Sequence, residues 1–153
     1  MNIKEITELT KDFCFNYRSP STYSHDMFQS DFLRKIGCRV VEEYEIIFDN
    51  VRANGDIFEQ RGFLDLLVFY EQMKIAMEFD NGNLLKLKST SKLLQSETDM
   101  IIGIIRGNQR YNVWYRNMRR IKYVMKRLRI HRRPILLIIN SHKSASWIDG
   151  LDY

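Results

Sequence analysis

The chain has 153 residues, of which 44% are hydrophobic and 28% are charged, an ordinary composition for one globular domain with its own core. It holds no run of roughly 18 apolar residues that could span a bilayer, and its first residues lack the basic-then-apolar pattern of a secretory signal. The two cysteines, Cys14 and Cys38, lack metal-ligand spacing and lie in apolar segments, which favours buried thiols over a disulfide. We therefore expect a cytoplasmic protein that folds as a single domain over residues 1–153 and contacts no membrane.

The net charge of +5 conceals an uneven distribution of charge along the chain. Residues 1–99 contain 17 acidic and 12 basic residues, whereas residues 100–153 contain 2 acidic and 12 basic ones. No acidic residue occurs between Met100 and Trp147. A concentrated basic surface is typical of proteins that bind nucleic-acid phosphates; the alternatives are a solvated helix face or a patch for an acidic protein partner.

The first half of the chain predicts two helices followed by three strands. Hydrophobic spacing of three and four residues indicates the helices, and apolar runs between turn signals indicate the strands. In chain order we expect a helix over 3–15, a second helix from Ser21 or Ser24 to about Ile36, a strand over 39–48, a turn over 49–60, and strands at about 61–70 and 74–80. Gly37 is a natural end for the second helix.

The rest of the chain alternates helices and strands. We expect a short helix over 87–95, a buried strand over 100–106, a long helix over about 110–130 and a buried strand over 134–140, whereas residues 141–153 show little periodicity. Alternating strands and helices imply parallel strands joined by crossovers, and the preceding hairpins imply antiparallel ones. The predicted fold class is therefore α/β, with a mixed central sheet flanked by helices.

Two acidic residues interrupt the apolar strands on either side of the second predicted hairpin turn. Asp65 and Glu78 each lie among apolar neighbours, where a carboxylate is costly unless it is paired or binds a cation. Residues two apart on a strand share a face, so Glu78 and Asp80 project together, and Asp65 joins them if it lies opposite Glu78. Oxygen ligands of this kind suit Mg²⁺ or Mn²⁺. The alternatives are that Asp65 pairs with Arg61 or a lysine and that Asp80 only begins a turn.

The order of these acids resembles that of the PD-(D/E)XK, or restriction-endonuclease-like, nuclease superfamily. The resemblance rests on Asp65 in a hairpin strand, Glu78 in the next strand and an acid on an N-terminal helix. It implies a restriction-endonuclease-like core of order α-β-β-β-α-β over about residues 21–106. The basic helix and the last strand, residues 107–140, would be additions to that core.

The resemblance also implies a divalent-metal site. Its ligands would be the side chains of Asp65 and Glu78 and the carbonyl oxygen of Phe79, and Asp80 is a further candidate ligand. Asp26, near the start of the second predicted helix, is the candidate for the family's helix acid, although its charge would equally stabilise the helix N-terminus. The implied cofactor is Mg²⁺ or Mn²⁺.

Position 80 departs from the family pattern, which has a lysine two residues after the glutamate. This chain has Asp80 there, and Lys88 and Lys92 on the following helix are the candidates to replace that lysine. The two lysines are four residues apart and share one helical face. Together with Asp65 and Glu78 they form the predicted catalytic set.

The segment from Arg106 to Arg133 is strongly basic and contains nine arginines and two lysines. Arginine favours bidentate contacts with phosphate, and the interleaved Tyr111, Tyr115 and Tyr123 could stack on bases or sugars. We expect contacts with the nucleic-acid backbone rather than readout of bases. The predicted nucleic-acid-binding residues are Arg61, Arg110, Arg116, Arg119, Arg120, Lys122, Lys126 and Arg127.

These observations predict a metal-dependent DNA endonuclease that hydrolyses phosphodiester bonds with structure-selective or backbone-directed recognition. They do not distinguish RNA from DNA, and the small size of the chain favours a structure-selective enzyme or a homodimer. The absence of the Glu-x-Lys lysine leaves open a second function, a nucleic-acid-binding protein with the nuclease fold but no activity. Metal-dependent cleavage that is lost in Asp65→Ala would separate the two.

Overall fold

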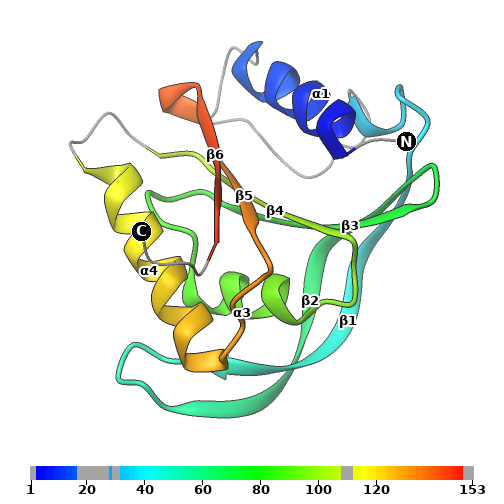
Figure 1. Ribbon diagram of the computed structural model, residues 1–153. Helices are drawn as coiled ribbons and strands as arrows, with labels where there is room; N and C mark the ends of the chain where they lie inside the picture. The colour runs from blue at the N-terminus through cyan, green and yellow to red at the C-terminus, as the bar shows by residue number, and fades with distance from the viewer. Residues whose placement is uncertain (1–2, 17–27, 29–31, 108–111, 150–153) are drawn as a thin grey trace.

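The computed structural model describes residues 3–16, 28, 32–107 and 112–149. The protein is an α/β structure in which helices flank a six-stranded mixed sheet (Figure 1). The elements in chain order are α1 (Ile3–Asn16), β1 (Arg39–Val51), β2 (Ile57–Tyr70), β3 (Met73–Asp80), α3 (Leu87–Gln95), β4 (Met100–Ile105), α4 (Val113–Leu128), β5 (Ile135–Ile139), the 3-10 turn η3 (Asn140–His142) and β6 (Ser144–Ile148). No helix in the described part of the chain is long and apolar enough to cross a membrane.

The strands lie side by side in chain order from β1 to β6. β1, β2 and β3 form an antiparallel meander, β3, β4 and β5 are parallel, and β6 runs antiparallel to β5. The parallel strands are joined through α3 and α4, because parallel neighbours need a crossover connection. The prediction of a mixed sheet with an antiparallel part followed by a parallel part is therefore confirmed.

Each face of the sheet contributes to its own hydrophobic core. On one face Ile102 of β4 clusters with Ile6 of α1. On the other face Ile101 of β4 clusters with Leu93 of α3 and Ile121 of α4. Because alternate residues of β4 serve opposite cores, every residue of this strand is buried, as its unbroken apolar run predicts.

The second predicted helix, which ends near Ile36, lies mostly outside the described residues. Its end is described: Gly37 has a φ of 88°, and the Cys38 N–H donates to the carbonyl oxygen of Leu33 at 2.9 Å. This arrangement ends helices at a glycine, because glycine adopts a left-handed conformation without steric cost. A glycine turn therefore lies where the sequence predicts the second helix to end.

The hairpin of β1 and β2 is longer than the sequence predicts. Residues 49–60 are expected to form a turn, but most of them belong to the two strands. The hairpin tip is held by α4, where the Tyr123 hydroxyl donates to the Arg52 carbonyl at 3.2 Å and the Arg127 guanidinium donates to the Gly55 carbonyl. Since these contacts come from a helix far along the chain, the local pattern does not show them.

A second difference lies at the C-terminal end of the described chain. Residues 141–153 show no strand pattern in the sequence, yet Ser144–Ile148 forms β6 at the edge of the sheet. Pairing with β5 places Ile148 opposite Ile135, and Ile148 is buried. β6 therefore forms because it pairs with β5 and buries Ile148, and not because of any periodicity in its own sequence.

The face of β2 that each side chain occupies changes at Asp65, within the β1–β2 hairpin. Leu66 belongs to the core that includes α1, whereas Leu64 belongs to the core that includes α3 and α4. Residues two apart share a face in a regular strand, so β2 twists about its own axis between them. Glu43, which lies on β1 between the partners of Leu64 and Leu66, has a positive φ of 51°. Figure 1 shows the β1–β2 ribbon curving away from β3 and passing beneath α3 and α4.

Candidate active site

Glu78 is an almost fully buried carboxylate in β3, with 1% of its surface exposed. Lys92 of α3, itself buried, forms an ion pair with Oε1 of Glu78. The Lys92 ammonium also donates to the carbonyl oxygen of Phe63 at 2.7 Å. The two acceptors hold the ammonium beside the acid of β3.

The carboxylates of Asp65 and Glu78 each accept a hydrogen bond from a backbone N–H of the strand that carries the other acid. The Asp65 N–H donates to Oε2 of Glu78 at 2.6 Å, and the Phe79 N–H donates to Oδ2 of Asp65 at 2.7 Å. Regular pairing of β2 with β3 runs only as far as Leu66 and Met77. Past that point the two carboxylates accept strand N–H groups, so both acids lie where the hairpin strands stop pairing.

The environment of Glu78 favours its protonated form. The pKa of Glu78 is raised from 4.5 to about 8; burial and the negative charge of Asp65 raise it, while Lys92 and the Asp65 N–H act in the opposite direction. Burial dominates because a charged carboxylate is poorly stabilised away from water. An additional cation at this position would stabilise both carboxylates in their charged forms.

The residues present fit a hard divalent cation. Asp65, Glu78 and the Phe79 carbonyl offer only oxygen donors, which suit Mg²⁺ or Mn²⁺. Within the described ranges no three His, Cys, Asp or Glu side chains gather closely enough to hold a metal together. Magnesium is commonly bound by one or two carboxylates with water completing its shell, so two carboxylates are sufficient.

Asp80 occupies a different environment from the one the sequence predicts. Its Oδ2 accepts the Lys86 N–H at 2.8 Å, and its Oδ1 lies 4.0 Å from the Lys86 ammonium. Asp80 thereby fixes the chain just before α3 begins. The predicted convergence of Asp65, Glu78 and Asp80 into one cluster is not observed in the described part of the chain.

The other predicted site residues separate in space. Of the two candidate lysines, Lys92 lies against Glu78, whereas Lys88 is exposed. Arg61 is exposed on β2 and pairs with Glu45 across the ribbon at 3.0 Å. Asp26, the candidate helix acid, lies outside the described residues.

Gly62 is a site residue that the sequence reasoning missed. A Cβ atom at this position would lie 2.9 Å from Cε1 of Phe48 and 3.7 Å from Cδ of Lys92. The absence of a side chain therefore leaves room for the Phe48 ring and the stem of Lys92. A glycine within an otherwise long strand is the signal that could have indicated this close approach.

Most predicted nucleic-acid-binding residues lie on α4. Arg116, Arg119, Lys126 and Arg127 are exposed, and Arg120 and Lys122 are partly buried. Arg127 is engaged with the hairpin tip, as described above. Arg110 lies outside the described residues.

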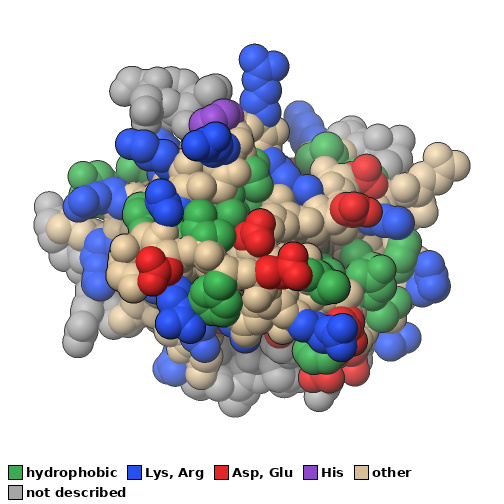
Figure 2. Space-filling view, turned by 90° about the horizontal axis from the view of Figure 1, so that it is seen from below, with side chains coloured by type: hydrophobic (Ala, Val, Ile, Leu, Met, Phe, Trp, Pro, Cys, Tyr) green, Lys and Arg blue, Asp and Glu red, His purple; other side chains and the backbone are tan. Residues whose placement is uncertain are grey.

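The face seen from the side of the β1–β2 ribbon carries charges of both signs. Figure 2 shows lysine and arginine side chains around its edge and acidic side chains gathered nearer its middle. The concentration of basic residues in the second half of the chain therefore does not make this whole face basic. The role of each cation on α4 therefore depends on its own contacts and exposure rather than on the net charge of the chain.

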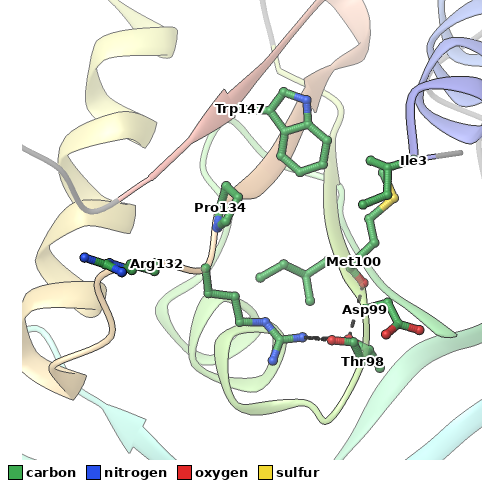
Figure 3. Close-up of a pocket in the computed structure, with 9 residues that line it drawn as sticks. Ile3, Thr98, Asp99, Met100, Arg132, Pro134 and Trp147 are labelled. Carbon is green, nitrogen blue, oxygen red and sulfur yellow. Dashed lines mark hydrogen bonds between the residues drawn. The ribbon is translucent and has the colours of Figure 1, made fainter. Parts of the chain in front are cut away.

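Arg133, in the segment between α4 and β5, is a basic residue with a structural role. Its guanidinium donates to the carbonyl of Ser96, and to the carbonyl and hydroxyl oxygens of Thr98 at 2.8 and 2.7 Å. These bonds lie beside a hollow of about 480 Å³ that Trp147 and Pro134 also line (Figure 3). Arg133 ties the start of β5 to the segment before β4.

Comparison of the chain with family models, curated proteins and solved structures finds no match.

Proposed function

We propose that this protein is a metal-dependent nuclease that hydrolyses phosphodiester bonds in DNA. The observation that carries the proposal is the buried Glu78, which lies beside Asp65 and is paired with Lys92 where β2 and β3 stop pairing. The order β1-β2-β3-α3-β4 also supports the proposal, because it follows the β-β-β-α-β part of the α-β-β-β-α-β core of the restriction-endonuclease-like superfamily. The helix expected to begin that core lies mostly outside the described residues.

The roles follow from the positions of the side chains. When bound, Mg²⁺ or Mn²⁺ would polarise a phosphoryl oxygen and lower the pKa of an attacking water. Asp65, Glu78 and the Phe79 carbonyl are the residues that would hold the ion. Lys92, positioned by the Phe63 carbonyl, would orient the water and stabilise negative charge that develops on the phosphate.

Lys92 thereby takes the role of the lysine that the family pattern places at position 80. Its ammonium reaches Glu78 from α3 rather than from β3. Asp80 in turn contributes to the start of α3, since it accepts the Lys86 N–H. The replacement of lysine by Asp80 is therefore compatible with a catalytic cation in the site.

Cleavage assays test the proposal. The purified protein is incubated with branched, single-stranded and duplex DNA in Mn²⁺ or EDTA. We expect Mn²⁺-dependent cleavage that falls by about 100-fold or more in Glu78→Gln. Glu59→Gln is the matched control, because Glu59 is an exposed acid on the same strand as Asp65, and this variant retains cleavage.

A second function is favoured by one specific observation. Both carboxylates of the site already accept strand N–H groups, and Glu78 also has Lys92 as a partner, so the arrangement is satisfied by the chain itself. This would suit a nucleic-acid-binding protein that has the nuclease fold without activity. DNA binding without cleavage in Mn²⁺ would establish this alternative.

A further inference from the structure

An open hollow lies between α4 and the loop that follows β3. It is lined by Leu84, Arg116, Arg119 and Arg120 and has a volume of about 340 Å³. Pockets for small ligands span roughly 300–1,000 Å³, so the hollow can hold a group the size of part of a nucleotide. None of its lining residues is acidic. Three arginines therefore border one space, and none of the described residues that line it carries a carboxylate.

Arg120, one of the arginines that line the hollow, has a hydrogen-bond donor without a partner among the described residues. Its Nε is buried and has no hydrogen-bond partner within the described residues. A buried polar group without a partner is costly, so a shift of the Arg120 side chain that brings Nε to an acceptor would remove that cost. Arg116 and Arg119 also line this hollow and are exposed.

The wall of the hollow is tied to the candidate active site. Leu84 lies in the loop between β3 and α3, and Asn117 of α4 holds this loop on both sides of Leu84. Oδ1 of Asn117 accepts the Leu85 N–H at 2.8 Å, and Nδ2 donates to the Asn83 carbonyl at 2.8 Å. The loop begins after Asp80, two residues beyond Glu78 on β3. The arginines are thus held in a fixed relation to the acids.

We infer that this hollow binds a backbone phosphate of the nucleic-acid strand that reaches Glu78, an inference that rests on the proposed function. Guanidinium groups bind phosphate in a bidentate manner, and several arginines around one space suit a polyanionic strand whose phosphates each carry one charge. Tyr115 is 52% exposed, and the Arg119 guanidinium lies 5.7 Å from the centre of its ring. An exposed aromatic ring beside the arginines suits a base or sugar adjoining the bound phosphate, which an acidic peptide lacks.

Binding in the absence of metal tests the inference separately from cleavage. Fluorescently labelled single-stranded and duplex DNA is titrated with protein in EDTA, and anisotropy is measured over a range of salt concentrations. We expect the double variant Arg116→Gln/Arg119→Gln to bind about 100-fold more weakly, or about tenfold per arginine. The slope of log affinity against log salt should fall by about one for each phosphate contact removed.

Two further variants separate specific contacts from net charge. Arg116→Lys/Arg119→Lys keeps the charge but loses the bidentate geometry, so we expect an affinity between those of the wild type and the glutamine variant. Lys35→Gln removes a charge from an exposed position in the turn before β1 and retains wild-type affinity. Arg116 and Arg119 are exposed, so their variants should fold, which thermal unfolding checks.

The outcomes are distinct. Equal binding by the wild type and the double glutamine variant, or equal weakening in Lys35→Gln, overturns the assignment of the hollow. Displacement of DNA by polyglutamate at equal charge concentration, with the same dependence on Arg116 and Arg119, overturns it in favour of an acidic protein partner. Binding that depends on Arg116 and Arg119, without cleavage in Mn²⁺, would contradict the proposed nuclease activity and support the assignment of the hollow. Cleavage in Mn²⁺ without binding that depends on Arg116 and Arg119 would support the nuclease activity and contradict the assignment of the hollow.

Discussion

Lys92 is a buried cation and Arg133 is a partly buried one, and the two differ in the groups that they contact. Arg133 donates its hydrogen bonds to backbone carbonyls and hydroxyls, which remain neutral at every pH of interest, although the charge of Asp99 also acts on it. Lys92 donates to one carbonyl but also pairs with Glu78, whose charge is opposed by burial and by Asp65. A cation among neutral acceptors joins two segments, whereas a cation among carboxylates forms a site whose charge depends on pH and on bound ions.

The largest expected effect separates the two cations by activity. Lys92→Met should lower Mn²⁺-dependent cleavage by about 100-fold or more, because no other described cation contacts Glu78. Arg133→Met should retain cleavage at a temperature where circular dichroism shows both variants to be folded. Initial rates on the same substrate measure this difference. Equal losses in the two variants would contradict the comparison.

The pH dependence of stability examines the charge of Glu78. The raised pKa, about 8 against 4.5, means that folding favours the protonated form. The wild type should therefore lose stability relative to Glu78→Gln as the pH rises from about 4.5 to about 8, by at most about 1.4 kcal/mol per pH unit, and no further above that range. Urea denaturation in EDTA measures the difference.

Two additions sharpen this experiment. Mn²⁺ should reduce the pH dependence, because a bound cation stabilises the charged carboxylate. The difference between the wild type and Arg133→Met should show no such slope, since a guanidinium stays charged throughout this range. A constant difference between the wild type and Glu78→Gln would show that Glu78 is charged in the folded protein over the whole range.

Arg133 should contribute more to stability than its neighbour. Arg133→Met leaves the Ser96 and Thr98 carbonyls without this donor, and we expect a loss of about 2 kcal/mol in the free energy of unfolding. Arg132→Gln changes an exposed arginine on the same segment and should stay within about 0.5 kcal/mol of the wild type. Similar values for the two variants would show that the hydrogen bonds of Arg133 add nothing.

The smallest effect concerns the space around Lys92. Gly62→Ala places a Cβ against the Phe48 ring and should lower the free energy of unfolding by about 1 kcal/mol, with a parallel loss of cleavage as Lys92 shifts. Gly82→Ala is the matched control, because no atom lies within 4 Å of a Cβ there. Chemical denaturation and cleavage rates report both quantities. If Gly62→Ala changed neither the free energy of unfolding nor the cleavage rate, the space around Phe48 and the aliphatic part of Lys92 would accommodate a methyl group.

Much of the fold is readable from local patterns. The structure places α3 at Leu87–Gln95, as the sequence predicts, because a short amphipathic segment between turn signals has few alternatives. The buried strands β4 and β5 are equally clear from their apolar runs. The hairpin extension and β6 were missed, since α4 holds the hairpin tip and β5 supplies the partner for β6.

The sequence by itself determined the mixed sheet and predicted that Asp65 and Glu78 lie close together, because acids within apolar strands stand out without any knowledge of the partners. Only the tertiary structure decided that Lys92 rather than Lys88 meets Glu78, that Asp80 accepts the Lys86 N–H, and that three arginines of α4 share one hollow. Those outcomes depend on the rotation of each helix against the sheet. That rotation is set by packing between residues distant in the chain, such as Asn117 against Leu85, so no local pattern contains it.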